Sequence, residues 1–271
     1  MVMDWSKVVD WSKVKIYDLS QPTSWKQPPF MWYPPMKVYW IKTLGEHGVN
    51  AQFIETSLHF GTHFDSQMHF VTGGKDVASL PLEGYLVGEG VVVDISPYVS
   101  DYDIYTSNTM EKAAREGGVE IKKGDILIIH TGYHKYAWCG TEPDEVRYMV
   151  KHPGPDISFA KWCIDMKIKW IGVDAMSADH PLNTVIRRAR PDLVAEAEKK
   201  WGKKIDELMP WPENYQLMHL KLFPHMILHA ENLGGEISKI VNRRCIIGAF
   251  PFKFQDGESA FARIVAFASE K

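Results

Sequence analysis

The sequence lacks the features that mark membrane, secreted and nucleic-acid-binding proteins. It has no apolar run of about 18 residues, and its N-terminal segment has no uninterrupted apolar core of the kind found in signal peptides. The formal net charge is −3 and no stripe of basic residues is visible, which argues against nucleic acid as a partner. We therefore expect a cytoplasmic protein that does not associate with membranes.

Cysteine is scarce, and one common catalytic motif is missing. Cys139, Cys163 and Cys245 are widely spaced, odd in number and form no Cys-x-x-Cys pattern. This excludes a disulfide framework and favours reduced thiols. The Gly-x-Ser-x-Gly elbow of serine hydrolases is also absent from the sequence, which disfavours serine catalysis.

The remaining composition is typical of a globular protein with a substantial core, since 45% of the 271 residues are hydrophobic and 24% are charged. We assign residues 1–15 to an N-terminal arm, in which Asp4-Trp-Ser-Lys-Val8 recurs as Asp10-Trp-Ser-Lys-Val14, and residues 16–271 to a single domain. Strand-like and helix-like segments alternate, which predicts a sheet with flanking helices. The predicted strands are 85–94, 125–130 and 170–174, and the predicted helices are 108–117, 159–166 and a charged stretch at 187–208.

Three histidines and an aspartate gather in the segment His59-Phe-Gly-Thr-His63-Phe-Asp65-Ser-Gln-Met-His69. Imidazole nitrogen and carboxylate oxygen are ligands that suit zinc, manganese or iron. A helix would turn Asp65 away from the two histidines, and a straight strand would hold His59 and His63 roughly 13 Å apart. Gly61 can instead take a positive φ, which predicts a tight turn that brings His59, His63 and Asp65 onto one ion. We expect a strand at residues 52–58 to lead into this turn.

Two alternatives remain open for this segment. It could be a polar surface loop that is rich in histidine, although the phenylalanine neighbours favour partial burial, where polar groups need partners. His69 could be the proton carrier of a hydrolytic reaction, because imidazole titrates near physiological pH, or it could be a fourth metal ligand.

A proline-rich aromatic segment covers residues 25–36, and its four prolines exclude regular helix and interior strand. Aromatic side chains at this density are unfavourable in solvent unless they pack or bind something. Phe30, Trp32 and Tyr33 could therefore line a substrate pocket or cover the core.

The histidine segment resembles the motif of the cyclase-type metal-dependent hydrolases, the family that includes bacterial kynurenine formamidases, isatin hydrolases and trans-dienelactone hydrolases. The family pattern is His-x-Gly-Thr-His-x-Asp-x-Pro-x-His, and this chain departs from it by Gln67 in place of the proline. Further similarity extends over roughly residues 16–267. It includes Asp18-Leu-Ser-Gln-Pro22, Gly124-Asp-Ile-Leu-Ile-Ile-His-Thr-Gly132, Gly172-Val-Asp-Ala-Met-Ser177 with Asp179, and His219 followed by Glu231-Asn-Leu233.

The resemblance implies a two-part metal centre. His59, His63 and Asp65 would bind one ion, and Asp65 would bridge to a second ion held by His219 and Glu231. From the residues alone, His225 and His229 compete with His219, and their default role is packing or hydrogen bonding within the sheet. The implied cofactor is a divalent metal, Zn²⁺ or Mn²⁺, with one or two ions per subunit.

The resemblance also implies a fold, a catalytic residue and an assembly. The fold would be α/β, a swivelling β/β/α domain with a mixed central sheet and flanking helices, and the chain would form a homodimer or homotetramer. His69 would be catalytic, and the proline-rich segment would lie near the active site, which favours the pocket role of its aromatic residues. Asp174, Ser177 and Asp179 would orient the loop or the ligands.

The predicted function is hydrolysis of a C–N acyl bond in a small, cyclic or aromatic amide by metal-activated water. Gln67 adds two hydrogen-bonding ends that could contact the substrate. Gln67, the long N-terminal arm and the 187–208 insertion also distinguish this chain from the compact kynurenine formamidases. One alternative is a metal-dependent lactone or ester hydrolase. Another is a non-catalytic metal-binding or small-molecule-binding protein on the same fold.

Overall fold

The computed structural model describes residues 13–269. The first copy of the Asp-Trp-Ser-Lys-Val repeat and most of the second lie outside the described residues, so the assignment of residues 1–15 to an arm stays a prediction. In the described part of the chain, no helix combines the length and the apolar character needed to cross a membrane.

The sheet and helix segments alternate along most of the chain. The strands are β1 (Val14–Asp18), β2 (Lys37–Lys42), β3 (Ala51–Glu55), β4 (His63–Asp65), β5 (Val87–Asp94), β6 (Ile104–Tyr105), β7 (Ile126–His130), β8 (Gly154–Pro155), β9 (Trp170–Val173), β10 (Leu228–Glu231), β11 (Arg243–Pro251) and β12 (Ser259–Ser269). The α-helices are α1 (Leu44–His47), α2 (Ser107–Glu116), α3 (Glu145–Val150), α4 (Ile157–Asp165), α5 (Ile186–Ala189), α6 (Pro191–Trp201), α7 (Ile205–Leu208) and α8 (Leu217–Leu222). The predicted strands that became β5, β7 and β9, and the predicted helices that became α2 and α4, are confirmed with bounds shifted by a residue or two.

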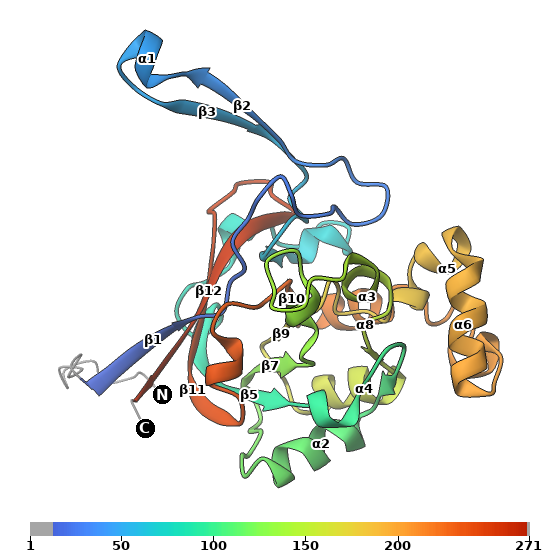
Figure 1. Ribbon diagram of the computed structural model, residues 1–271. Helices are drawn as coiled ribbons and strands as arrows, with labels where there is room; N and C mark the ends of the chain where they lie inside the picture. The colour runs from blue at the N-terminus through green and yellow to red at the C-terminus, as the bar shows by residue number, and fades with distance from the viewer. Residues whose placement is uncertain (1–12, 270–271) are drawn as a thin grey trace.

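The central strands close into a mixed barrel with helices around it (Figure 1). Their hydrogen-bonded order is β12-β11-β5-β7-β9-β10-β4, and β4 pairs back with β12 to close the ring of seven strands. The β5, β7, β9 and β10 strands run parallel to one another, whereas the pairs that involve β4, β11 or β12 are antiparallel. The mixed sheet and the flanking helices are as expected. The sequence does not predict that the sheet closes into a barrel. The description as a swivelling β/β/α domain stays a prediction.

The sequence of β7 is a continuous run of mostly apolar residues because both faces of the strand are buried. Ile126 and Ile128 join the apolar cluster to which every strand of the ring contributes, so they lie inside the barrel. Leu127 and Ile129 join a second cluster that contains Met110 of α2 and residues of α4 and α8, so they face the helices on the outside. A strand that is buried on both faces has no solvent-facing side, so polar residues do not alternate with apolar ones along it.

The same alternation decides which face of the barrel carries the histidine segment. On β4 and β10, Phe64 and Ala230 belong to the interior cluster. Successive side chains of a strand point to opposite faces, so their neighbours His63, Asp65 and Glu231 point outward, towards the side covered by α8.

A two-stranded hairpin formed by β2 and β3 stands away from the barrel, with α1 at its tip (Figure 1). The strand expected at 52–58 ends at Glu55, so the residues that lead into the histidine turn are irregular instead. Residues 21–36, which include the proline-rich segment, contain no helix or strand, as predicted.

The charged stretch 187–208 is helical, as predicted, but it is divided into α5, α6 and α7. Gly202 ends α6 in a left-handed conformation, with φ of 64°. Leu193 and Ile205 pack into an apolar cluster with Leu182 of the preceding loop, at the edge of the molecule beyond α8 (Figure 1).

Candidate metal centre

The turn at Gly61 brings the predicted ligands together. Its φ is +67°, and a Cβ at this position would lie 2.9 Å from Thr23 Oγ1, so both conformation and space favour glycine. The Nδ1–H of His63 donates to the Gly61 carbonyl oxygen at 2.8 Å, which leaves His63 Nε2 as the nitrogen with a lone pair. The tight turn expected from the sequence is therefore confirmed.

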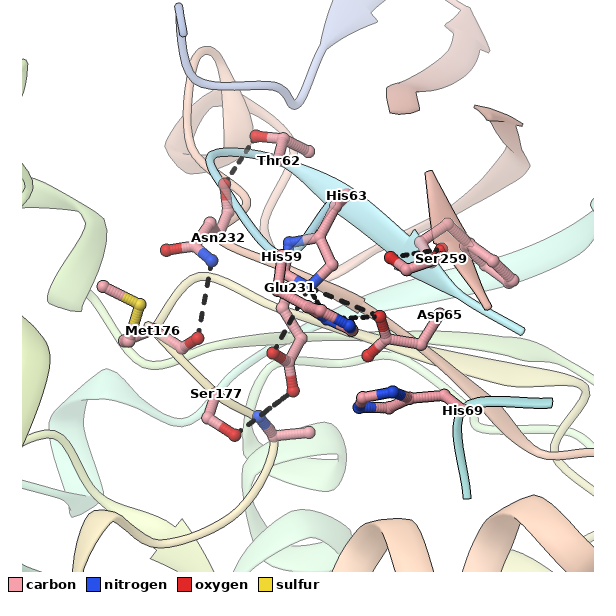
Figure 2. A network of polar contacts seen from close by, with 12 residues as sticks. His59, Thr62, His63, Asp65, His69, Met176, Ser177, Glu231, Asn232 and Ser259 are labelled. Atoms are coloured by element: carbon pink, nitrogen blue, oxygen red, sulfur yellow. Dashed lines mark hydrogen bonds and ion pairs between the residues drawn. The ribbon is translucent and has the colours of Figure 1, made fainter. Parts of the chain in front are cut away.

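Asp65 is the centre of the cluster (Figure 2). Its side chain is fully buried, and neither carboxylate oxygen accepts a well-aligned hydrogen bond from residues 13–269. Its Oδ1 lies 3.0 Å from His59 Nδ1 and 3.4 Å from His63 Nε2. Its Oδ2 lies 3.6 Å from His219 Nε2. Burial of such a carboxylate is unfavourable unless positive charge lies beside it, either on a protonated imidazole or on a bound ion.

The second half of the cluster comes from β10 and α8. Antiparallel pairing of β10 with β4 places Glu231 opposite His63, with Oε2 3.7 Å from His63 Nε2. The Nε2 of His219 lies 3.8 Å from Glu231 Oε1. His219 and Glu231 thus converge on Asp65, as the resemblance predicted, and His225 does not take that place because it is exposed at the end of the turn after α8.

The loop after β9 holds both of these side chains. Asp179 Oδ2 lies 2.6 Å from His219 Nδ1, and Asp179 Oδ1 accepts a hydrogen bond from the Met218 backbone N–H. Glu231 Oε1 accepts from the Ala178 backbone N–H at 2.7 Å and from the Ser177 hydroxyl (Figure 2). Since His219 donates through Nδ1, its Nε2 is the nitrogen that faces Asp65 and Glu231. These contacts agree with the orienting role expected of Ser177 and Asp179.

Glu258 is a member of the site that the sequence did not reveal. One of its oxygens lies 2.7 Å from His59 Nε2 and 2.8 Å from His69 Nδ1, so it joins the two imidazoles. The segment Asp256-Gly-Glu258 has no motif that indicates a functional residue. Glu258 could be found only by placing the start of β12 beside β4.

The sequence predicts a packing or hydrogen-bonding role for His229, and packing is what the structure shows, since its ring lies 4.6 Å from the rings of His219 and Phe223. It is fully buried, and neither ring nitrogen has a hydrogen-bond partner among the described residues. It lies two residues before Glu231 on β10 and therefore on the same face. Ligand atoms of Asp65, His219, His229 and Glu231 all lie within 4.8 Å of one another, so His229 is a further candidate ligand.

The histidines and carboxylates of the cluster shift one another's pKa values. Burial opposes ionisation of Asp65, but the facing imidazoles of His59 and His63 outweigh burial and hold the pKa of Asp65 well below its usual range. Burial disfavours protonation of His59 and His219, yet the neighbouring carboxylates raise the pKa of His59 to about 11 and that of His219 to about 10. Burial and then the charge of Asp65 raise the pKa of Glu231.

The donor set fits a divalent metal. It combines imidazole nitrogens with carboxylate oxygens, the ligands that zinc and manganese accept. Unpartnered buried atoms on Asp65 and His229 lie within the cluster, where an ion would supply the missing interaction. His59, His63, Asp65, His219 and Glu231 would hold the ions, and His229 lies within reach of the second.

The cavity above the cluster is small, about 40 Å³, and Phe30 and Tyr33 line it. The ring of Tyr33 lies 5.8 Å from that of His59. Trp32 and Gln67 are not among the described residues that line this cavity. Trp32 has a positive φ of 71°, and its side chain is 71% exposed.

Gln67 has a different use in this structure. Its amide group donates to the Phe223 carbonyl oxygen at 3.1 Å, and its carbonyl oxygen accepts from the Lys75 backbone N–H at 3.2 Å. Both polar ends are therefore engaged in holding the loop that carries His69. Substrate contact by Trp32 or Gln67 stays a prediction that this arrangement does not favour.

The family assignment rests on the same stretch of chain. Residues 17–180, more than half of the chain, match the family model called Cyclase. The chain belongs to the Cyclase family. This match contains His59, His63, Asp65 and His69, whereas the other half of the site lies beyond it.

Relatives of this Cyclase-family chain include kynurenine formamidases. The protein of that name from Bacillus anthracis is 31% identical over 172 residues, which cover 61% of this chain and 70% of the relative. Among solved structures, isatin hydrolase A from Ralstonia solanacearum superposes with a TM-score of 0.75 and 19% identity, covering 94% of this chain and 92% of that protein. An isatin hydrolase bound to the product analogue thioisatinate gives a TM-score of 0.74 at 18% identity, covering 96% of this chain and 94% of that protein. At such identities the structural matches establish the fold of this Cyclase-family protein.

Proposed function

We propose that this protein is a metal-dependent hydrolase that cleaves the C–N acyl bond of a small, cyclic or aromatic amide. The observation that carries the proposal is Asp65, a fully buried carboxylate without a well-aligned hydrogen bond within residues 13–269 and surrounded by candidate ligands. A structural cluster would satisfy that carboxylate with hydrogen-bond donors. The neighbours of Asp65 are instead side chains that could bind a cation together with it.

A divalent ion such as Zn²⁺ or Mn²⁺, when bound, supplies two kinds of chemistry: it acidifies a water molecule and polarises a carbonyl group. Two sets of residues would hold one or two ions. His59 and His63 would hold one ion, His219 and Glu231 the other, and Asp65 has an oxygen for each.

His69 is the residue to which we assign transfer of the proton. Its Nδ1 lies 2.8 Å from Glu258, so that nitrogen holds the hydrogen, and Nε2 is left to accept a proton and return it. His69 lines the same cavity as His63 and Glu231. It can therefore take the proton from the attacking water and give it to the leaving nitrogen.

The substrate class is supported by the aromatic wall and by the relatives. Phe30 and Tyr33 offer aromatic faces against which a flat ring can pack, next to the ligand cluster. The cavity of about 40 Å³ is smaller than usual ligand sites, so these side chains must move when a substrate enters. The relatives are named for hydrolysis of a formamide and of isatin, a cyclic aromatic amide.

A lactone or ester hydrolase is the second candidate, because the same ion and the same His69 would serve an oxygen leaving group. The two are separated by a hydrolysis screen of metal-loaded protein across isatins, formylanilides and dienelactones. Turnover of the amides supports the proposal, and turnover confined to the lactones replaces it with the alternative. Hydrolysis of none of them, with metal bound, would favour a binding protein.

The ligand set is tested separately by metal analysis of purified variants. Alanine at His59, His63 or Asp65 should remove most of the metal bound at this centre, and the activity, while the chain remains folded by circular dichroism. Alanine at His47, an exposed histidine at the tip of the hairpin, is the matched control and should change neither. Full metal retention in all three ligand variants would refute the assignment.

Self-association as a homodimer or homotetramer is proposed from the hairpin of β2 and β3. Trp40 and Ile41 on β2 are each 59% exposed, and Phe53 and Ile54 on β3 are more than half exposed. A two-stranded ribbon is marginally stable alone, and an apolar one in solvent is unfavourable. A second copy of the chain would cover it. Light scattering of the wild type and of Trp40→Ser should show a larger species for the wild type, and a monomeric wild type would contradict the proposal.

A further inference from the structure

A second group of histidines lies apart from the metal centre. His130 is the last residue of β7, and His134 lies in the turn that follows it. Their Nε2 atoms lie 3.4 Å and 3.1 Å from a single oxygen, the hydroxyl of Ser238. None of these three residues lines the cavity above Asp65, and the proposed reaction uses none of them.

Each imidazole in this group is held by its own carboxylate. His130 Nδ1 lies 2.8 Å from Asp94 Oδ1, and His134 Nδ1 lies 2.8 Å from Asp174 Oδ2. A ring that donates through Nδ1 presents a lone pair at Nε2, and a carboxylate behind the imidazole is the usual support of a histidine that binds a metal. Both lone pairs therefore point to the position of Ser238.

Asp174 is an anchor rather than a ligand in this arrangement. Its Oδ1 accepts from the Thr131 backbone N–H and hydroxyl, and its Oδ2 accepts from the Gly132 backbone N–H as well as from His134. These bonds use the four acceptor positions of the carboxylate. The Thr131–Gly132 bend is thereby fixed, and with it the relative orientation of His130 and His134.

The Ser238 hydroxyl cannot satisfy both imidazoles, because it has one hydrogen to donate and two lone pairs face it. We propose that His130 and His134 form a peripheral site for a divalent transition-metal ion such as Zn²⁺, bound through both Nε2 atoms, with the Ser238 hydroxyl and water completing the coordination. Potential ligand atoms of His130, His134 and Asp174 lie within 4.8 Å of one another, which agrees with a shared ion.

The site is open to solvent and its charge permits a cation. Ser238 is exposed, and a surface cavity of about 480 Å³ leads to both histidines. Two cationic side chains line that cavity, but Lys135 lies 3.5 Å from Glu142 and Arg147 lies 3.0 Å from Asp101. With these two paired, the carboxylates of Asp94 and Asp174 supply the negative charge behind the imidazoles.

The test is a Zn²⁺ titration of the full chain by calorimetry, with metal content measured after gel filtration. His134→Ala should bind one equivalent fewer than the wild type, and Asp94→Asn should weaken that equivalent by roughly 10–100-fold. His47→Ala is the matched control and should bind as the wild type does. Circular dichroism reports whether each variant is folded, and His134, which is only partly buried, carries the test if Asp94→Asn does not fold.

Independence from the metal centre is tested by adding Asp65→Ala. That variant should keep the peripheral equivalent, and the double variant Asp65→Ala/His134→Ala should lose it, so failure of one site is distinguished from failure of the other. If His134→Ala binds as much Zn²⁺ as the wild type in both backgrounds, the two histidines hold no metal. In that case His130 would be protonated and would donate to the Ser238 oxygen, while the Ser238 hydroxyl would donate its one hydrogen to His134.

Discussion

Replacing Asp179 by asparagine should weaken metal binding although Asp179 is not itself a ligand. Both oxygens of Asp179 accept hydrogen bonds, one from His219 Nδ1 at 2.6 Å and one from the Met218 backbone N–H at 2.7 Å. Asparagine has the same shape but only one oxygen, so its amide group must face one of the two N–H donors. Asp179 is fully buried, and water cannot take over the lost contact.

The conflict is relieved if His219 changes its tautomer. Its Nδ1 would then accept from the asparagine amide, and its hydrogen would move to Nε2, the atom 3.6 Å from Asp65 and 3.8 Å from Glu231. A protonated Nε2 cannot bind an ion. Loss of such a supporting carboxylate typically costs roughly 10–100-fold in metal affinity, or about 1.4–2.8 kcal/mol.

Competition for Zn²⁺ between the protein and a chromogenic chelator measures this change directly. Asp76→Asn is the matched control, because Asp76 also accepts two backbone N–H groups, from Ser79 at 2.9 Å and from Asp256 at 2.7 Å, but lies on a partly exposed turn. We expect Asp179→Asn to lose affinity and Asp76→Asn to keep it. If folded Asp179→Asn binds Zn²⁺ as tightly as the wild type, His219 is not a ligand oriented by Asp179.

Three further predictions concern single histidines. His69→Ala should keep stoichiometric metal but lower turnover by roughly 10²–10⁴-fold, the usual contribution of general acid–base catalysis; loss of metal together with activity would make His69 a ligand instead. His229→Leu should lower metal affinity without destabilising the metal-free chain. The reason is that neither ring nitrogen of His229 has a hydrogen-bond partner among the described residues, so leucine loses no such bond. Unchanged affinity in chelator competition would exclude His229 as a ligand. Burial lowers the pKa of His180 to about 3, so the unfolded chain, with a pKa near about 6.5, binds the extra proton first. The stability from neutral His180 is therefore complete above that value and falls as the pH drops, by about 2 kcal/mol at pH 5. Burial also lowers the pKa of His152, so urea unfolding at pH 7 and pH 5 should show a loss that is smaller by about 2 kcal/mol in His180→Gln than in the wild type. Equal losses in the two proteins would show that His180 is not the cause.

Several features could be predicted because their cause is local. Ile126–His130 is a strand whichever partner it meets, since it is a short apolar run bounded by turn residues. The grouping of His59, His63 and Asp65 also depends on one local event, the positive φ of Gly61, so the spacing of three residues was enough to predict it. The identity of the ligand types further limited the chemistry to a divalent metal.

Other features depend on how distant segments pair. Glu231 reaches the site because β10 pairs with β4 in the register that sets it opposite His63, and that register involves residues more than 150 positions apart. Glu258 is brought in by the pairing of β12 with β4, and no motif marks it. Resemblance to a family predicted the first of these residues, whereas the residues themselves left His225 and His229 as competitors of His219.

The sequence by itself indicated the chemistry of the first half-site, because a turn, three candidate ligands and their spacing lie within seven residues, His59 to Asp65. Only the tertiary structure decided what completes that half-site. Closure of the barrel sets β10 and β12 on either side of β4, which supplies Glu231 on one flank and Glu258 on the other. Such contacts arise from the summed packing of the whole core rather than from any local preference, so a short stretch of sequence carries no record of them.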